Sequence, residues 1–139
     1  MNSFISTKVV YATLEIFEMS IRINEVTRVL HNRLILALVE EYEKNGCYVK
    51  ADHISHPHGK PDPVNGHIPD IVVYSNGKII IIAEAETCDT ISDISTLEQW
   101  QAFSRSSYQF HVIVPEECLE AAKRQATLWS ISVNKWWYL

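Results

Sequence analysis

Cysteine is scarce in this chain of 139 residues, and its placement excludes two classes of small protein. Cys47, Cys88 and Cys118 are odd in number, lie far apart and form no CxxC pair. A secreted domain that depends on a disulfide framework, or a zinc site built from cysteine pairs, needs thiols at closer and more regular spacing. We therefore expect three reduced cysteines with mostly structural roles.

The sequence also lacks a long apolar run. Its first residues have neither the basic start nor the sustained apolar core of a signal peptide, and the run 79–83 is far too short to cross a bilayer. These absences predict a cytoplasmic protein without a membrane partner. The length and an ordinary hydrophobic share of 47% suit one globular domain, which we expect to span residues 1–139.

Basic residues are outnumbered, with 12 Lys and Arg against 17 Asp and Glu and a formal net charge of −5. Proteins that bind nucleic acid usually present a basic face to the phosphates, so this balance argues mildly against such a partner. A metal-dependent nuclease nevertheless gathers acids in its active site, where bound cations offset them. Net charge alone does not decide between the two classes.

Hydrophobic periodicity predicts an alternation of helices and strands. Apolar residues recur at helical spacing from about residue 24 to residue 45, and Gly46 can end that helix. Residues 1–22 give a weaker signal, in which residues 11–23 could form an extra helix or part of a longer one. Strands are expected at 47–50, 71–74, 78–83, 110–114 and 131–138, with helices at 94–107 and after Pro115. The prolines, glycines and histidines of residues 52–67 predict a surface loop. The expected fold is α/β, a mixed sheet of four to five strands flanked by helices.

Three carboxylates converge on the hairpin that residues 71–83 are expected to form. Asp70 opens its first strand, and Glu84 and Glu86 follow its second strand, where they share one face at a separation of roughly 7 Å. Acids at the end of so apolar a strand are stable if they are exposed, if one is protonated, or if they share a divalent cation. The third arrangement would allow catalysis.

The turn around Gly77 decides whether Asp70 joins the two glutamates. A two-residue turn places Asp70 opposite Ala83, on the wrong face for Glu84. A three-residue turn with a bulge at Gly77 places Asp70 opposite Ile82, on the face of Glu84. A shared metal site therefore requires this bulge or an equivalent shift elsewhere.

The order Pro69-Asp70, hairpin, Glu84-Ala85-Glu86 resembles the motif of the PD-(D/E)XK nucleases, over roughly residues 24–114. The resemblance implies a restriction endonuclease-like fold and hydrolysis of DNA, with Asp70, Glu84 and Glu86 as catalytic residues and ligands of Mg²⁺ or Mn²⁺. Glu86 stands where the family usually has Lys, although some restriction enzymes carry Glu there. A catalytically inactive member that binds nucleic acid or a protein partner is the alternative.

The same resemblance suggests further residues of the site. Glu25, on the first helix, is by its order in the chain the candidate for an additional metal ligand. Gln99, four residues before Phe103, is similar to a Gln and aromatic pair in the RecB-like branch of the family. Lys60 and Lys78 are candidate phosphate contacts, and a homodimer is a further expectation about partners.

Two other features admit more than one interpretation. His53, His56 and His58, with Asp52, Asp62 and His67 nearby, have the residue types that bind zinc, but their spacing matches no specific zinc motif, so solvated or phosphate-contacting histidines are favoured. The tail Trp136-Trp137-Tyr138 could stack on bases. Aromatic residues at the end of a domain more often complete a core or an interface, which we expect here.

Overall fold

A computed structural model describes the backbone of residues 2–139 and the side chains from residue 8 onward. The chain forms two compact units, residues 1–30 and residues 31–139. Helix α1 (Asn2–Lys44) contributes to both units and begins well before residue 24, where the predicted helix starts. The prediction of a single domain over residues 1–139 stays a prediction.

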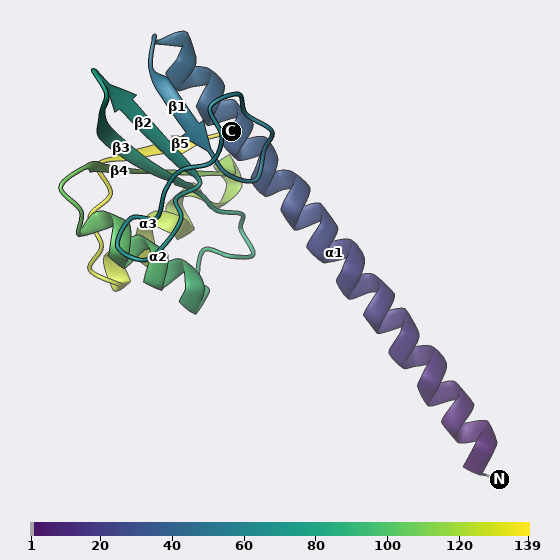
Figure 1. The fold of residues 1–139 in the computed structure, drawn as a ribbon. Coiled ribbons are helices and arrows are strands. Elements are labelled where there is room, and N and C mark those ends of the chain that lie inside the picture. The colour runs from purple at the N-terminus through teal and green to yellow at the C-terminus, as the bar shows by residue number, and fades with distance from the viewer. Residues whose placement is uncertain (1) are drawn as a thin grey trace. The chain divides into compact units, whose positions relative to one another are not determined.

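The larger unit is built on a mixed sheet of five strands in the order β1-β2-β3-β4-β5 (Figure 1). The strands are β1 (Tyr48–Ala51), β2 (Ile71–Ser75), β3 (Lys78–Ala85), β4 (Gln109–Val114) and β5 (Lys135–Tyr138). The first three pair antiparallel, whereas β3, β4 and β5 run parallel. The predicted α/β fold, with a mixed sheet of four to five strands flanked by helices, is confirmed.

Helices cover both faces of this sheet. The part of α1 from residue 34 onward packs on one face through Leu34, Ile35 and Leu38, which are at most 3% exposed. On the other face lie α2 (Ile94–Ser104) and α3 (Leu119–Leu128), preceded by the short 3₁₀ turn η1 (Glu116–Cys118). Leu119, Ala122 and Ala126 of α3 pack into this second cluster, together with Trp129, which directly follows the helix.

The two tryptophans of the aromatic tail pack against the core, as expected, whereas Tyr138 is exposed. Trp136 and Trp137 follow each other on β5, so their side chains point to opposite faces of the sheet. Trp136 packs into the cluster beneath α2 and α3, and Trp137 into the cluster beneath α1. Both indoles therefore help to close the edge of the sheet.

Two expectations from the sequence are corrected, one about the burial of a strand and one about the cysteines. The unbroken run Ile79–Ile82 predicts a strand buried on both faces, but Ile80 is 38% exposed and full burial begins at Ile82. Cys88 and Cys118 form a disulfide with a Cα–Cα distance of 5.6 Å, so the prediction of three reduced thiols is wrong, while Cys47 is free. The two half-cystines meet because β3 and β4 are parallel neighbours, which brings the segments that follow them to the same edge.

No helix in the part of the chain that the structure describes is long and apolar enough to cross a membrane.

Candidate active site

The β2–β3 hairpin closes through a two-residue turn. Asn76 and Gly77 have φ values of 51° and 75°, the left-handed conformation that a type I′ turn requires at both central positions. Ser75 consequently pairs with Lys78. The predicted bulge at Gly77 is absent.

An equivalent shift occurs further along the hairpin, between Val73 and Tyr74. Tyr74 pairs with Ile79 and Val73 with Ile81, so Ile80 is an extra residue on β3. Beyond the shift Ile71 pairs with Ala83, which places the preceding Asp70 directly across from Glu84. The shift on which the shared acidic site depends is therefore present, although at a different residue.

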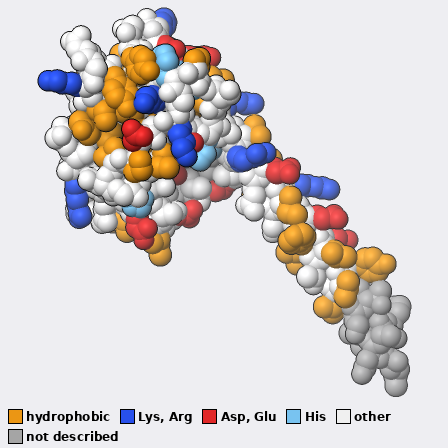
Figure 2. Space-filling model, viewed as in Figure 1, with side chains coloured by type: hydrophobic (Ala, Val, Ile, Leu, Met, Phe, Trp, Pro, Cys, Tyr) orange, Lys and Arg blue, Asp and Glu red, His pale blue; other side chains and the backbone are white. Residues whose placement is uncertain are grey.

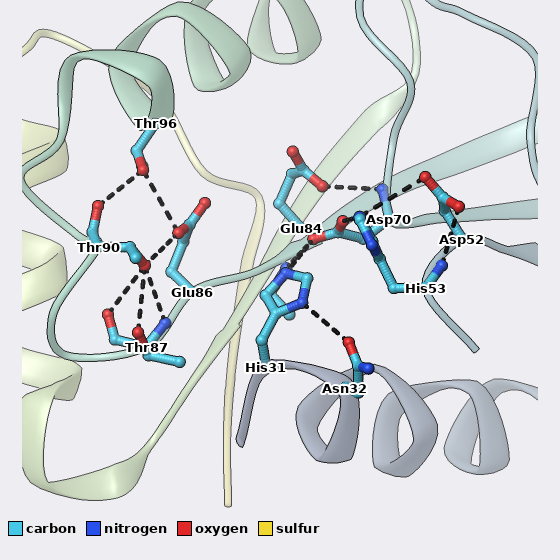
Figure 3. Close-up of polar contacts among 11 residues, drawn as sticks. His31, Asn32, Asp52, His53, Asp70, Glu84, Glu86, Thr87, Thr90 and Thr96 are labelled. Carbon is cyan, nitrogen blue, oxygen red and sulfur yellow. Dashed lines mark hydrogen bonds and ion pairs between the residues drawn. The ribbon is translucent and has the colours of Figure 1, made fainter. Parts of the chain in front are cut away.

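Asp70 and Glu84 hold each other in place through the backbone. The N–H of Asp70 donates to Glu84 Oε2 at 2.8 Å, and the N–H of Ala85 donates to Asp70 Oδ2 at 2.9 Å (Figure 3). Asp70 is 6% exposed and Glu84 is 1% exposed. Two carboxylates are thus fixed side by side in the interior at the end of the hairpin.

Two imidazoles flank the carboxylate of Asp70 (Figure 3). His31 Nε2, from α1, lies 3.2 Å from Asp70 Oδ2, and its Nδ1 lies 3.4 Å from Asn32 Oδ1. His53 Nε2, from the loop after β1, lies 3.4 Å from Asp70 Oδ1 and 3.6 Å from Asp52 Oδ2. Asp70 is therefore the acid of this cluster that has cationic partners within reach.

These contacts separate the protonation states of the two neighbouring acids. Burial raises the pKa of Asp70, but the hydrogen bonds and charge of His31, with those from Glu84 and Ala85, lower it by more. Burial and the negative charge of Asp70 raise the pKa of Glu84 well above its ordinary value. Burial also lowers the pKa of His31, yet Asp70 outweighs this and brings it to about 8. Asp70 is therefore ionised, His31 is cationic near neutral pH, and Glu84 keeps its proton.

Glu86, just past the end of β3, turns toward a pair of threonines. Thr90 Oγ1 donates to Glu86 Oε2 at 2.6 Å, and Thr96 Oγ1, from α2, lies 3.4 Å from the same oxygen (Figure 3). Burial raises the pKa of Glu86 to about 7, against the lowering effect of the Thr90 hydrogen bond. Glu86 is thus a buried carboxyl that can gain or lose a proton near neutral pH.

The three acids suit a divalent cation in their donor chemistry but are not arranged around one. Carboxylate oxygens are the ligands that Mg²⁺ prefers, and a cation would relieve the repulsion that raises the pKa of Glu84. In the described residues, however, no three His, Cys, Asp or Glu side chains form a group that could hold a metal ion. Glu84 is bonded toward Asp70 and Glu86 toward Thr90, so binding would require these side chains to turn.

The other predicted site residues are Lys60, Lys78, Gln99 and Glu25. Lys60 and Lys78 are exposed, and Lys78 begins β3, about 20 Å along the strand from Glu84 by the rise per residue. Gln99 is partly exposed on α2. Glu25 is exposed on the part of α1 that belongs to the smaller unit. None of these four is among the contacts of Asp70 and Glu84 described above.

The histidine-rich loop uses its side chains for contacts within the protein. His56 Nε2 lies 3.1 Å from Glu43 Oε1, and His58 Nδ1 lies 3.0 Å from the carbonyl oxygen of Val49. His67 packs edge-on against Phe103, which is fully buried. The zinc site that the residue types allow is not formed among the described residues.

Sequence reasoning did not find His31, Thr90 or Thr96. His31 could have been found, because it precedes Ile35 and Leu38 by four and seven residues and so shares their buried face of the helix. The two threonines carry no sequence signal, since the turn between β3 and α2 brings them to Glu86.

Fold and site together define an α/β protein with a buried acidic cluster at the ends of adjacent strands. No protein-family model, curated protein or solved structure matches this chain. The function is therefore inferred from the site itself.

Proposed function

We propose that this chain is a Mg²⁺- or Mn²⁺-dependent nuclease of the PD-(D/E)XK type that hydrolyses phosphodiester bonds of DNA. The observation that carries the proposal is the pairing of Asp70 with Glu84, produced by the irregular register of the hairpin. An extra residue in a strand usually serves to aim side chains near a functional site. Two buried acids with opposed pKa shifts are also typical of catalytic centres.

Each residue has a defined part in this proposal. Asp70 and Glu84 would hold the cation, and Glu86 would hold it or orient the attacking water. The bound cation would offset charge on the scissile phosphate and lower the pKa of a bound water. Glu86 can accept a proton near neutral pH because burial raises its pKa to about 7. His31 orients the Asp70 carboxylate from α1.

A second candidate is a catalytically inactive module of the same fold that binds nucleic acid or a protein partner. Two observations favour it. The described residues contain no group of three side chains set to hold a metal ion, and Glu86 is bonded to Thr90 instead of facing Asp70.

A cytoplasmic location is part of the proposal, on the composition of the sequence. The disulfide between Cys88 and Cys118 is the observation against it, since such bonds are rare in reducing compartments. Alkylating the free thiols of the native protein at the moment of lysis, before any oxidation, decides the question. Three alkylated cysteines support the cytoplasm, and one supports an oxidising compartment.

The decisive experiment combines cleavage with metal binding on the full chain. Plasmid, branched and single-stranded DNA are incubated with the protein and Mg²⁺ or Mn²⁺, and Mg²⁺ affinity is measured by calorimetry. We expect cleavage, and a loss of at least about a hundredfold in rate for Asp70→Asn and for Glu84→Gln, because each variant removes a ligand charge. Asp62→Asn, an exposed carboxylate of the loop, is the matched control and should cleave normally. Absence of both cleavage and Mg²⁺ binding would establish the inactive module.

A further inference from the structure

The smaller unit exposes a continuous apolar stripe on α1. The stripe consists of Val9, Ala12, Ile16, Met19, Ile23, Val26 and Leu30. Six of these side chains, all but Ala12, are between 40% and 66% exposed. Apolar side chains are visible along the described turns of this helix in Figure 2. An exposed apolar stripe of this length marks an interaction surface, for another protein chain or for a membrane.

The spacing of the stripe identifies the kind of surface. Successive members lie three and four residues apart in strict alternation, which is the heptad pattern of a coiled coil with a period of 3.5 residues. The four members at a positions are Val9, Ile16, Ile23 and Leu30, and three of them are β-branched. In parallel coiled coils, β-branched residues at the a positions favour two strands when the d positions hold Leu. Two of the three d positions here, Ala12 and Met19, are likewise not β-branched.

The stripe stops at a defined point. Arg33 occupies the next d position and is exposed, so the apolar seam ends at Leu30. One residue later Leu34 is buried in the core of the larger unit. The apolar pattern that runs from Ile23 to Leu38 therefore contributes to two surfaces. Its residues up to Leu30 are exposed, whereas Leu34 and Leu38 are buried.

The residues beside the stripe allow a second copy to approach. Lys8, Glu15 and Arg22 occupy g positions, and the e positions that they would face across a parallel pair are Thr13, Ser20 and Thr27. Every flanking pair thus joins a charged residue to a neutral hydroxyl residue. No pair sets like charges opposite each other, so the pattern contains no electrostatic barrier to self-association.

We propose that a second copy of this chain covers the stripe, and that residues 9–30 of two chains form a parallel two-stranded coiled coil. The seam spans about 32 Å of helix. Burying its six large apolar side chains would remove roughly 400–700 Å² of surface from water on each helix, at roughly 60–120 Å² per side chain. This approaches the roughly 800 Å² per partner of a stable interface before the flanking residues are counted. The inference does not depend on the proposed nuclease activity.

A second apolar row on the same helix provides a matched control. Val10, Leu14, Phe17 and Ile21 also alternate at helical spacing, but the next position of this row is the polar Asn24, which ends it. Phe17 is 61% exposed and Ile16 is 66% exposed. Ile16 and Phe17 therefore lie on different sides of the helix but are almost equally exposed.

The test is the mass of the full chain in solution, measured by light scattering after size exclusion and by sedimentation equilibrium. We expect twice the 16.0 kDa of one chain. The double variant Ile16→Glu, Ile23→Glu should be monomeric, with a dissociation constant at least a hundredfold higher, because it places four carboxylates in the seam. Phe17→Glu should remain a dimer. Near-ultraviolet circular dichroism of the buried tryptophans reports whether the larger unit stays folded in each variant.

Several results would overturn the proposal. One is a wild-type protein that is monomeric at a protein concentration of tens of micromolar. Another is a mass above that of a dimer. The third is a dimer that Phe17→Glu dissociates while the double variant does not. A monomer that instead binds vesicles of neutral lipid would assign the stripe to a membrane surface. Orientation is tested with Ile16→Cys in a Cys47→Ser background, where equivalent a positions of a parallel pair should cross-link under mild oxidation. A dimer that fails to cross-link would refute the parallel arrangement.

Discussion

Replacing His31 with Gln should remove a contribution to folding stability that exists only while the imidazole is charged. Asp70 raises the pKa of His31 from 6.5 to about 8, more than offsetting the opposite effect of burial. Because the folded pKa lies above the unfolded one, the stabilisation is complete below pH 6.5 and is lost as the pH rises through 8. The difference of about 1.5 units corresponds to about 2 kcal/mol. This is an upper value, since the His31 side chain is 22% exposed.

Urea unfolding in the presence of a chelator measures this contribution. Wild type and His31→Gln are compared at one pH below 6.5 and one above 8. The variant should be less stable by about 2 kcal/mol at the lower pH, and the gap should close by that amount at the higher pH. His58→Gln is the control, because the His58 ring lies against the Val49 carbonyl oxygen and its loss leaves the pair of His31 and Asp70 in place. A pH-independent gap for His31→Gln would refute the ion pair with Asp70.

The same histidine reports on the proposed metal site without any activity measurement. NMR titration of the ring, assigned with the His31→Gln variant, should give a pKa of about 8 in chelator. Added Mg²⁺ should lower this pKa toward its ordinary value, because a cation on Asp70 repels the imidazolium. A pKa near 6.5 in chelator would refute the ion pair, and a pKa near 8 that Mg²⁺ does not move would refute metal binding at Asp70.

Three further predictions concern the disulfide, a buried histidine and the protons of the acidic cluster. Replacing Cys88 and Cys118 with Ser should lower the free energy of unfolding by roughly 3–4 kcal/mol, from a sequence separation of 30, and equal stability in urea would contradict the bond. Burial lowers the pKa of His111 to about 4, so stability should fall by about 3 kcal/mol as the pH drops from 6.5 through 4, and a His111→Gln variant should not show this loss. Mg²⁺ binding should release protons, detected by calorimetry in two buffers of different ionisation enthalpy, and identical heats would contradict the protonated state of Glu84.

The hairpin shows how far local sequence determines the site. Asn76-Gly77 predicts a tight turn by its backbone preferences alone, and the structure has that turn. The sequence does not indicate which isoleucine is the extra residue, because consecutive isoleucines have identical strand preferences. Ile80 is extra because the sheet buries Ile82 on one face and Ala83 on the other, which fixes the register at that end.

Features that depend on distant pairing were not accessible from the sequence. The disulfide forms because β3 and β4 are parallel neighbours, and no local pattern links Cys88 to a residue 30 positions away. The sequence left open whether residues 11–23 form an extra helix or part of a longer one, and the structure has one long helix, α1. The signal is weak because residues 9–21 carry apolar residues on two sides of the helix, which reduces the contrast that defines an amphipathic face. The apolar stripe of residues 23–38 was detected, but its spacing does not reveal that exposure gives way to burial at Leu34.

The charges of the acidic cluster explain how its buried carboxyl groups are tolerated in the protein interior. They also bear on Glu86, which stands where the motif of the proposed nuclease family usually has lysine. Asp70 is ionised beside a cationic His31, and Glu84 keeps its proton. Glu86, which accepts a hydrogen bond from Thr90, gains or loses its proton near neutral pH. The buried charges therefore nearly cancel, which avoids the large cost of unpaired carboxylates in the interior. If the chain is the nuclease proposed above, His31 would supply from α1 the positive charge that a lysine usually brings at the position of Glu86. A cation could then enter only by displacing protons, so the affinity of the site for Mg²⁺ should rise with pH. An inactive module that binds no cation would show no such pH-dependent affinity for Mg²⁺.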